Sequence, residues 1–215
     1  IGYESQTINI LLKKNGIIEF QLKISEKMTD EILIQATRAG EKTPFAYSNI
    51  DNEEIKNQNT GQDIPSLLKL TPSLVTSSDA GTGIGYSQFW IRGSDLTRIN
   101  VTLNGIPMND AESHSVYWVD IPDFASSVEN IQIQRGAGTS TNGAGAFGAS
   151  VNLQTSKIEK EPYAEISNSY GSFNTLKTTA EVGSGMIKDK FVFDFRLSKI
   201  KSDGYVDRAW SDLKS

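Results

Sequence analysis

The feature that most constrains the fold of this chain is a series of short apolar strands, each bounded by glycine, between Phe89 and Leu153. The segments are FWIRG, INVTLNGIP, VENIQIQRGAG and GAFGASVNLQT, in that order. Glycine permits tight turns and close approach of backbones, so such strands suit a compact domain with short connections. None of these residues resembles an enzyme's nucleophile, and the sequence predicts no catalytic residue there.

Composition and charge exclude several classes of protein. The 215 residues carry a net charge of −5, whereas nucleic-acid-binding domains usually concentrate basic residues on one face, so no nucleic-acid partner is expected. The absence of cysteine excludes disulfides, thiolate metal sites and a cysteine nucleophile. No run reaches the roughly 18 apolar residues that a membrane-spanning helix needs. The start of the chain lacks the features of a signal peptide, which predicts a processed or artificial N-terminus.

The order of these strands resembles the plug domain of TonB-dependent outer-membrane receptors. In that family the strands carry the same isoleucine-arginine-glycine, asparagine-glycine and arginine-glycine-alanine signatures, in the order found here between Ile91 and Ala137. The resemblance extends from about Met28 to Ser215. It implies an α+β plug domain over residues 45–158, with a mixed sheet and short helices, and a transporter rather than an enzyme.

The first 27 residues predict a β-hairpin. Apolar residues alternate on both sides of Asn15-Gly16, a dipeptide that favours hairpin turns. A lone hairpin is marginally stable in water, so these strands are expected to complete a sheet. The resemblance implies that residues 1–27 are the tail of a carboxypeptidase-regulatory-like β-sandwich, and a hairpin packed on the next domain is the alternative.

Residues 28–44 predict an extended segment with a free edge. The run DEILIQATR has an acidic start and alternating aliphatic residues, and a polar stretch follows it to Pro44. An extended segment without a fixed partner can add a strand to another protein's sheet. The resemblance implies a TonB-box-like segment whose contacts with the energy-coupling protein are Ile32, Leu33, Ile34, Gln35 and Ala36. A last strand of the preceding domain is the alternative.

Two short helices are predicted before the glycine-bounded strands. Asp51 and Glu54 form a capping-box pattern, which opens the first helix. Asp63 precedes Pro65, a residue that suits a first helical turn, so a second helix is expected to begin there and to stop at Thr71-Pro72. Its inward-facing residues are expected to be Leu67, Leu68 and Leu70.

Two polar loops are candidate ligand contacts, because exposed loops are disproportionately functional. The first runs from Ser77 to Gln88, and the second runs from Ile106 to Trp118. By resemblance they face the external substrate through Thr82, Ile84, Tyr86, Met108, Asn109, Asp110, His114 and Tyr117. No bound metal is expected, since direct coordination by His114 would need several converging ligands. A chelated metal or vitamin held by hydrogen bonds and aromatic contacts is the expected ligand.

The segment from Gly143 to Gly148, GAGAFG, matches a dinucleotide-binding fingerprint but lacks its context. That fingerprint needs a strand before it and a helix after it, whereas residues 149–155 alternate as a strand. No P-loop lysine follows Gly136 either. We interpret both glycine clusters as sites of backbone packing. A nucleotide-binding enzyme is the minor alternative.

Arg92 and Arg135 each follow an apolar strand and precede a glycine, which places both guanidinium groups at strand ends. Arginine suits planar carboxylate partners. The resemblance implies that these two arginines lock the plug to glutamates on the barrel wall. Those glutamates would lie beyond Ser215, so both arginines are expected to be poorly paired within this chain. Two solvated surface arginines are the alternative.

Residues 159–215 predict long alternating strands. Three segments, at 162–170, 176–182 and 191–198, place apolar and polar side chains on opposite faces, which is typical of a transmembrane β-barrel. A soluble β-sandwich gives the same alternation. The resemblance implies the first three strands of an antiparallel 22-stranded barrel, with residues 202–210 as an extracellular loop. Three strands cannot close a barrel in lipid, so the chain is expected to be a fragment.

The resemblance implies TonB-dependent active import of an iron chelate, siderophore or similar small nutrient across the outer membrane. The expected partners are a TonB-type energy-coupling protein powered by ExbB/ExbD, the nutrient and outer-membrane lipid, and no cofactor is expected. The N-terminus would lie in the periplasm and the plug in the barrel lumen. The chain lacks a SusC-like ending, which favours an iron chelate or similar small ligand, and the resemblance implies a Bacteroidetes-type, non-SusC receptor. A soluble β-sandwich adhesion or glycan-binding module is the alternative.

Overall fold

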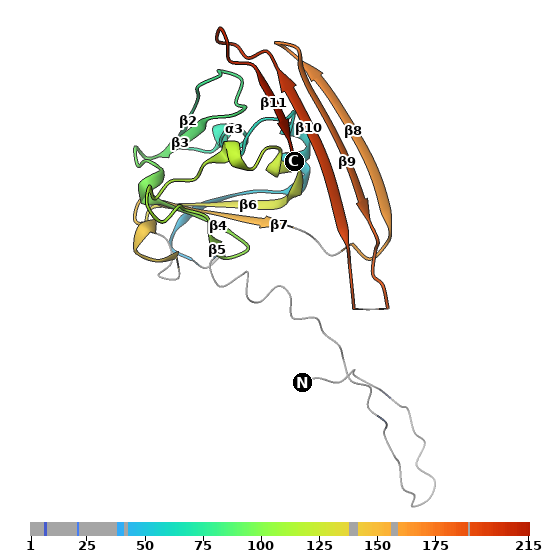
Figure 1. Ribbon diagram of the computed structural model, residues 1–215. Coiled ribbons are helices and arrows are strands. Elements are labelled where there is room, and N and C mark those ends of the chain that lie inside the picture. The colour runs from blue at the N-terminus through green and yellow to red at the C-terminus, as the bar shows by residue number, and fades with distance from the viewer. Residues whose placement is uncertain are drawn as a thin grey trace, which may run out of the picture.

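The structure is a computed structural model that describes residues 7, 21, 38–40, 43–137, 142–155, 159–188 and 190–215. The hairpin and β-sandwich tail predicted for residues 1–27 lie outside these ranges, apart from two isolated residues, and so do the box-like residues Ile32 to Ala36. In the described part, a five-stranded sheet and a two-stranded hairpin form one domain, and a four-stranded sheet stands beside it (Figure 1).

The five-stranded sheet is mixed and has the strand order β1-β6-β7-β4-β5. Its strands are β1 (Ala46–Ile50), β4 (Ile99–Leu103), β5 (Ile106–Pro107), β6 (Val128–Arg135) and β7 (Ala149–Thr155). Strands β4 and β7 are parallel, and the other neighbours are antiparallel. Three of the four glycine-bounded segments therefore form β4 to β7 of the predicted mixed sheet, whereas the first, FWIRG, belongs to β3 of the separate two-stranded hairpin.

Short helices connect the strands. They are α2 (Asn52–Gln58), α3 (Ile64–Leu67) and the 3₁₀ helices η1 (Leu68–Leu70), η2 (Leu96–Arg98), η3 (Trp118–Asp120), η4 (Phe124–Ser127) and η6 (Ala144–Ala146). The predicted cap of α2 is confirmed, because Asp51 Oδ1 accepts a hydrogen bond from the backbone N–H of Glu54 at 2.9 Å.

The second predicted helix differs from its prediction in two respects. Asp63 precedes α3, but its buried side chain accepts a hydrogen bond from Ser87 Oγ at 2.7 Å instead of capping the helix. Leu67 and Leu68 are buried, whereas Leu70 is 72% exposed. The chain tightens to 3₁₀ geometry after Leu67, and the change to three residues per turn rotates Leu70 away from the core.

The hydrophobic core lies on one face of the five-stranded sheet, beneath the helices and the hairpin of β2 (Leu74–Ser78) and β3 (Ser87–Ile91). Ile131 and Ile133 of β6 contribute to it, and the rings of Phe89 and Trp118 meet there with centroids 6.2 Å apart. The opposite face is polar, and it is buried on β4, β6 and β7 but exposed at Asn49 on edge strand β1. Register aligns one row of its side chains across four strands, namely Asn49, Gln132, Asn152 and Thr102.

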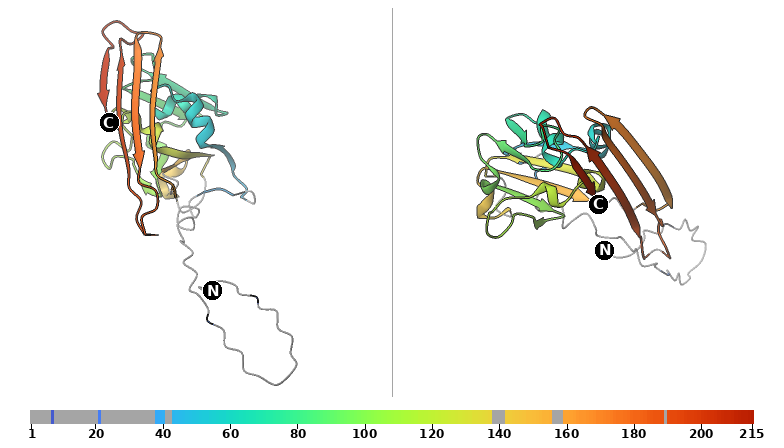
Figure 2. Two further views of the ribbon diagram at one scale, coloured as in Figure 1. Left: turned by 90° about the vertical axis from the view of Figure 1, so that its right-hand side faces the viewer. Right: turned by 45° about the horizontal axis from the view of Figure 1, so that its top comes forward.

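The four-stranded sheet, called the outer sheet below, is antiparallel and open, with the order β11-β10-β9-β8. Its strands are β8 (Tyr163–Gly171), β9 (Thr175–Gly183), β10 (Asp194–Ser202) and β11 (Ser211–Lys214). The sequence predicted three strands in this region, whereas the structure has four. The additional strand is β11, which follows the predicted loop and has only four residues, too few to show an alternating pattern. Figure 2 shows the sheet as a curved layer with one face toward the rest of the protein.

The two faces of the outer sheet have the reverse polarity of a soluble sheet. Apolar side chains point away from the five-stranded domain, and Ile166, Phe195 and Leu197 are 75%, 61% and 57% exposed. Polar side chains point toward the domain, where Lys177 and Thr179 are buried. A soluble sheet buries its apolar face, whereas a wall that meets lipid presents that face outward.

No helix in the described ranges is long and apolar enough to cross a bilayer.

Candidate functional site

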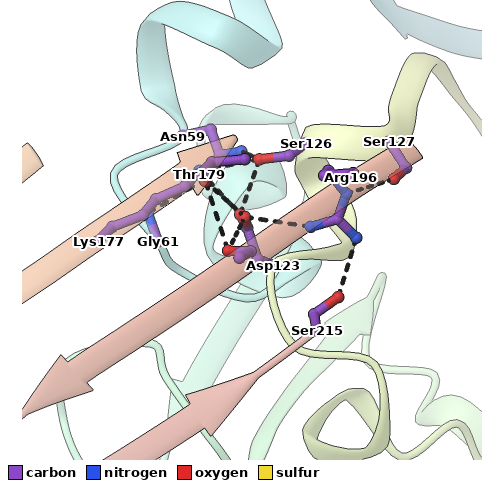
Figure 3. A network of polar contacts seen from close by, with 10 residues as sticks. Asn59, Gly61, Asp123, Ser126, Ser127, Lys177, Thr179, Arg196 and Ser215 are labelled. Atoms are coloured by element: carbon purple, nitrogen blue, oxygen red, sulfur yellow. Dashed lines mark hydrogen bonds and ion pairs between the residues drawn. The ribbon is translucent and has the colours of Figure 1, made fainter. Parts of the chain in front are cut away.

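The contact between the five-stranded domain and the outer sheet centres on Asp123 (Figure 3). This residue precedes η4 at φ 51°, in the left-handed region that aspartate tolerates better than most residues. Its side chain is fully buried and forms two ion pairs, with Lys177 Nζ at 2.8 Å and with Arg196 Nη1 at 3.3 Å. Lys177 lies on β9 and Arg196 on β10, so one carboxylate joins the domain to two strands of the outer sheet.

Three hydroxyl groups complete the coordination of this carboxylate. The donors are Ser198 Oγ at 2.5 Å, Thr179 Oγ1 at 3.1 Å and Ser126 Oγ at 2.8 Å. Burial alone raises the pKa of Asp123, but the charge and hydrogen bond of Lys177, together with the hydrogen bonds of Ser198 and Ser126, hold that pKa below its ordinary value. The carboxylate is therefore ionised at neutral pH.

The two cations also bond to the five-stranded domain directly. Arg196 Nε donates to Ser127 Oγ at 2.8 Å, and Lys177 Nζ donates to Ser126 Oγ at 2.9 Å. Asn59, just after α2, donates to the same Ser126 oxygen at 3.0 Å. The network thus ties α2, η4, β9 and β10 together, and fully bonded polar groups make a buried ionic contact specific in position.

Beside this network the interface opens into a polar cleft of about 730 Å³ between α2, the start of β6 and the outer sheet. Its charged lining is mostly acidic: Glu129, Glu159, Glu161, Glu165, Glu181 and Asp194, with Lys56 and Arg196. The ionic contact between the two parts of the protein is therefore localised around Asp123, with a polar cleft beside it.

Comparison with known proteins identifies the family. A family model described as TonB-dependent Receptor Plug Domain matches residues 39–150, more than half of the 215-residue chain. The chain belongs to the TonB-dependent receptor plug family. The matched residues contain Asp123 and all of the five-stranded sheet except the last part of β7, and the outer sheet follows them. The prediction of a receptor plug rather than an enzyme is therefore confirmed.

Individual relatives agree with this assignment. The chain is 28% identical over 139 residues to the vitamin B12 transporter BtuB of Vibrio vulnificus, covering 65% of this chain and 22% of that protein. It is 24% identical over 154 residues to a probable TonB-dependent siderophore receptor, PirA, of Acinetobacter baumannii, covering 67% and 20%. The chain therefore spans about a fifth of the length of these curated relatives.

Solved structures share the fold. The alcaligin outer-membrane receptor FauA from Bordetella pertussis superposes with a TM-score of 0.58 at 21% identity, covering 75% of this chain and 27% of that one. The ferripyoverdine receptor of Pseudomonas aeruginosa gives a TM-score of 0.58 at 15% identity, covering 74% and 20%.

Arg92 and Arg135 lie close together in the plug. Arg92 Nη1 donates to the backbone oxygen of Arg135 at 3.4 Å, and Arg135 Nη1 donates to that of Pro72 at 3.3 Å. Neither arginine forms an ion pair with a carboxylate in the part of the chain that the structure describes. Arg135 ends β6 and lies about 23 Å along this strand from its start at Val128, which adjoins the Asp123 network, at 3.3 Å per residue.

The first predicted ligand loop is the tip of the β2–β3 hairpin, residues 79–86. Ile84 is only 1% exposed, so its prediction as a substrate-facing residue is not supported: it packs inward as the one aliphatic residue of a polar loop. Thr82 is half-buried and Tyr86 is exposed. The hairpin tip contacts the loop between β10 and β11, because Tyr205 donates its N–H to the backbone oxygen of Ala80 at 3.0 Å.

The second predicted ligand loop contains both structural and exposed residues. Asn109 ties the loop to β4 through two hydrogen bonds. Its Oδ1 accepts from the backbone N–H of Val101 at 2.8 Å, and its Nδ2 donates to the backbone oxygen of Ile99 at 2.9 Å. Met108 packs against the core. Of the predicted ligand contacts in this loop, Asp110, His114 and Tyr117 are exposed. No hydrogen bond or ring contact links this loop to the hairpin tip within the described ranges.

Asp110 stabilises the turn in which His114 lies. The N–H and hydroxyl of Ser113 donate to Asp110 Oδ1 at 2.7 Å and 2.9 Å, and these hydrogen bonds lower the pKa of Asp110. The described residues contain no group of three or more His, Cys, Asp and Glu side chains placed to hold a metal ion.

The segment from Gly143 to Gly148 serves backbone packing. The N–H of Gly148 donates to the backbone oxygen of Arg98 at 3.0 Å, and a Cβ on Gly148 would lie 2.9 Å from that oxygen. Strand β7 follows immediately, rather than the helix that a dinucleotide site needs. The fingerprint is therefore a packing feature of the plug.

The Asp123 network was missed by sequence reasoning, which placed the contact between plug and barrel at the two arginines. One signal was present: Lys177 and Arg196 are cations on the polar face of alternating strands. Such a cation needs a buried partner if that face is covered. That partner, Asp123, is 73 positions away from Arg196 in the sequence. No local pattern distinguishes Asp123 from the other carboxylates of the chain.

A pH dependence follows from Asp63, whose burial raises its pKa to about 6 despite hydrogen bonds from Ser87 and Gly85. A raised carboxyl pKa means that the folded state binds the proton more tightly, so the contribution of Asp63 to stability is greatest below about pH 4 and is lost as pH rises through 6. We expect Asp63→Asn to stabilise the plug by about 2 kcal/mol at pH 7 and to change little at pH 4.

Urea unfolding at both pH values measures this effect, with Asp79→Asn on the exposed hairpin tip as the control. Equal stabilities of Asp63→Asn and the parent protein at pH 7 would contradict the expectation.

Proposed function

We propose that this chain supplies the plug and the first wall strands of a TonB-dependent importer of the outer membrane. The observation that carries the proposal is a family plug joined, through buried Asp123, to a sheet with a polar inner face and an apolar outer face. The soluble β-sandwich alternative is disfavoured, since such a sheet would expose its apolar face to water.

The outer sheet would continue into a closed barrel. Its edges, β8 and β11, have no further strand partner within the described residues, and unpaired backbone groups are costly in lipid. We infer that residues 159–215 begin a 22-stranded barrel around a plug at 45–158, with the N-terminus in the periplasm. The Bacteroidetes-type, non-SusC origin stays a prediction.

The ligand is proposed to be an iron chelate or a similar small nutrient. Exposed Tyr86, Asp110, His114 and Tyr117 offer aromatic faces and polar groups, which suit a ligand held by stacking and hydrogen bonds. One relative is named as a vitamin B12 transporter and another as a probable siderophore receptor, which supports this range of ligands.

Import would proceed by displacement of the plug from the wall. A TonB-type coupling protein would pair with Ile32 to Ala36 by strand addition and pull on them, using the inner-membrane proton gradient. Asp123 would hold the plug against strands β9 and β10 of the outer sheet. Arg92 and Arg135 would hold the plug on the opposite side of the lumen. Ligand must bind one state better than the other, because equal affinity for both states shifts nothing.

Uptake assays in cells that produce the full-length receptor test this function. Radiolabelled ferric siderophores and cyanocobalamin are offered to receptor-positive and receptor-null cells. We expect receptor-dependent accumulation of at least one of them, complete loss of accumulation with a protonophore, and unchanged binding at the cell surface. Accumulation that persists without the proton gradient would contradict the proposal.

A further inference from the structure

The segment that follows the box-like residues is bound to the polar face of the five-stranded sheet. The backbone N–H of Ala39 donates to Gln132 Oε1 at 2.6 Å, and the backbone oxygen of Ala39 accepts from Gln132 Nε2 at 2.9 Å. Ala39 and Gln132 are 6% and 2% exposed. One side-chain amide thus satisfies both backbone groups of a single residue, as a neighbouring strand would.

Arg38 adds a second attachment next to the first. Its Nη1 donates to Gln154 Oε1 at 2.6 Å, and its Nη2 donates to Asn130 Oδ1. Asn130 on β6 and Gln154 on β7 are direct partners in the register of these strands. The planar guanidinium therefore bridges the two strands, a geometry that lysine cannot reproduce.

Two other side chains, in addition to the backbone of Ala39, hold the amide of Gln132 in place. Its Nε2 also donates to Asn49 Oδ1 on β1 at 2.9 Å, and its Oε1 also accepts from Gln134 Nε2 at 2.9 Å. A buried amide fixed by two neighbours forms its remaining hydrogen bonds at a low entropic cost.

We propose that Arg38, Ala39 and Gln132 form a clamp that holds the chain on central strands β6 and β7 directly after the box-like residues. The inference rests on the proposed function, in which the coupling protein engages Ile32 to Ala36. The next regular attachment is β1, which begins at Ala46 on the edge of the sheet. Opening the clamp frees seven more residues, or about 25 Å of reach at up to 3.6 Å per residue.

The clamp therefore sets how far the box-like segment extends toward its partner at rest. The clamp also determines which strands first bear the force that the coupling protein exerts on the chain. While the clamp is closed, the force acts on central strands β6 and β7, and once the clamp has opened, it acts on edge strand β1.

A spin label at Gly40→Cys tests the clamp in the purified full-length receptor. The chain has no other cysteine within its 215 residues, and no atom lies within 4 Å of a Cβ at position 40. We expect Gln132→Leu and Arg38→Met each to increase label mobility. Hydrogen exchange at the Ala39 amide is expected to become about tenfold faster in Gln132→Leu. This change in rate corresponds to the usual free-energy cost of losing a buried hydrogen bond.

Binding of the coupling protein's periplasmic domain provides a functional readout. Both variants are expected to bind it more tightly than the parent in the absence of ligand. Arg208→Met, in the exposed loop after β10, is the matched control and should change neither readout. If Gln132→Leu fails to fold, Arg38→Met alone tests the clamp. Arg38 lies outside the sheet, so its replacement leaves the backbone hydrogen bonds between β6 and β7 intact.

Unchanged mobility in Arg38→Met would overturn the clamp. That result is distinguishable from failure of the proposed function, which would appear as uptake that survives removal of Ile32 to Ala36 whatever the mobility at position 40.

Discussion

Replacement of Asp123 by alanine is expected to weaken docking of the plug on the outer sheet by about 3–5 kcal/mol, the usual cost of removing one partner of a buried ion pair. The variant leaves Lys177 and Arg196 with side chains only 6% and 16% exposed and without their carboxylate. Uncompensated buried charge, rather than the lost attraction, dominates this cost. Urea unfolding of the full-length receptor in detergent measures it.

Two further variants separate the ionic contact from a general loss of packing. Asp123→Ala combined with Lys177→Met should cost less than Asp123→Ala alone, because it removes one of the two orphaned cations. Asp207→Ala, in the exposed loop after β10, should change stability by no more than about 0.5 kcal/mol. The account of the network would be contradicted if Asp123→Ala cost no more than Asp207→Ala.

The same contact has a defined dependence on pH. Since the pKa of Asp123 is depressed in the folded protein, its stabilising contribution is fully present above the ordinary aspartate pKa and is lost as pH falls through the depressed value. Docking of the plug is therefore expected to be insensitive to the ionisation of Asp123 from neutral pH down to about pH 4.

Local patterns predicted those parts of the structure that depend on neighbouring residues. Alternation located β6 and β9, the Asp51 cap located α2, and the strand after Gly148 excluded a dinucleotide site. The same patterns left open whether the polar or the apolar face of residues 159–215 would be buried. That question was decided only by the exposure of Ile166 and its neighbours.

The parts that sequence reasoning missed depend on contacts between distant segments. Asp123 meets Lys177 and Arg196 only after the outer sheet has docked on the plug, and Gln132 meets Ala39 across 93 positions. The inward position of Ile84 and the outward position of Leu70 follow from the path of a hairpin tip and of a 3₁₀ turn, which composition does not specify.

The second large effect is expected at the box-like segment. Strand addition depends on main-chain hydrogen bonds, so Ile34→Pro should abolish coupling by removing a donor from the paired edge. Ile34→Val keeps the backbone and the β-branched side chain and should retain uptake. Surface binding should survive in both variants, because the ligand is proposed to contact other loops.

Deletion of Ile32 to Ala36 in the full-length receptor tests whether this segment couples the plug to an energy source, with accumulation and surface binding of the radiolabelled ligand measured in the same cells. We expect accumulation to fall to the level of receptor-null cells while surface binding is unchanged. Accumulation at the parent level after the deletion would show that this segment does not couple the plug to an energy source.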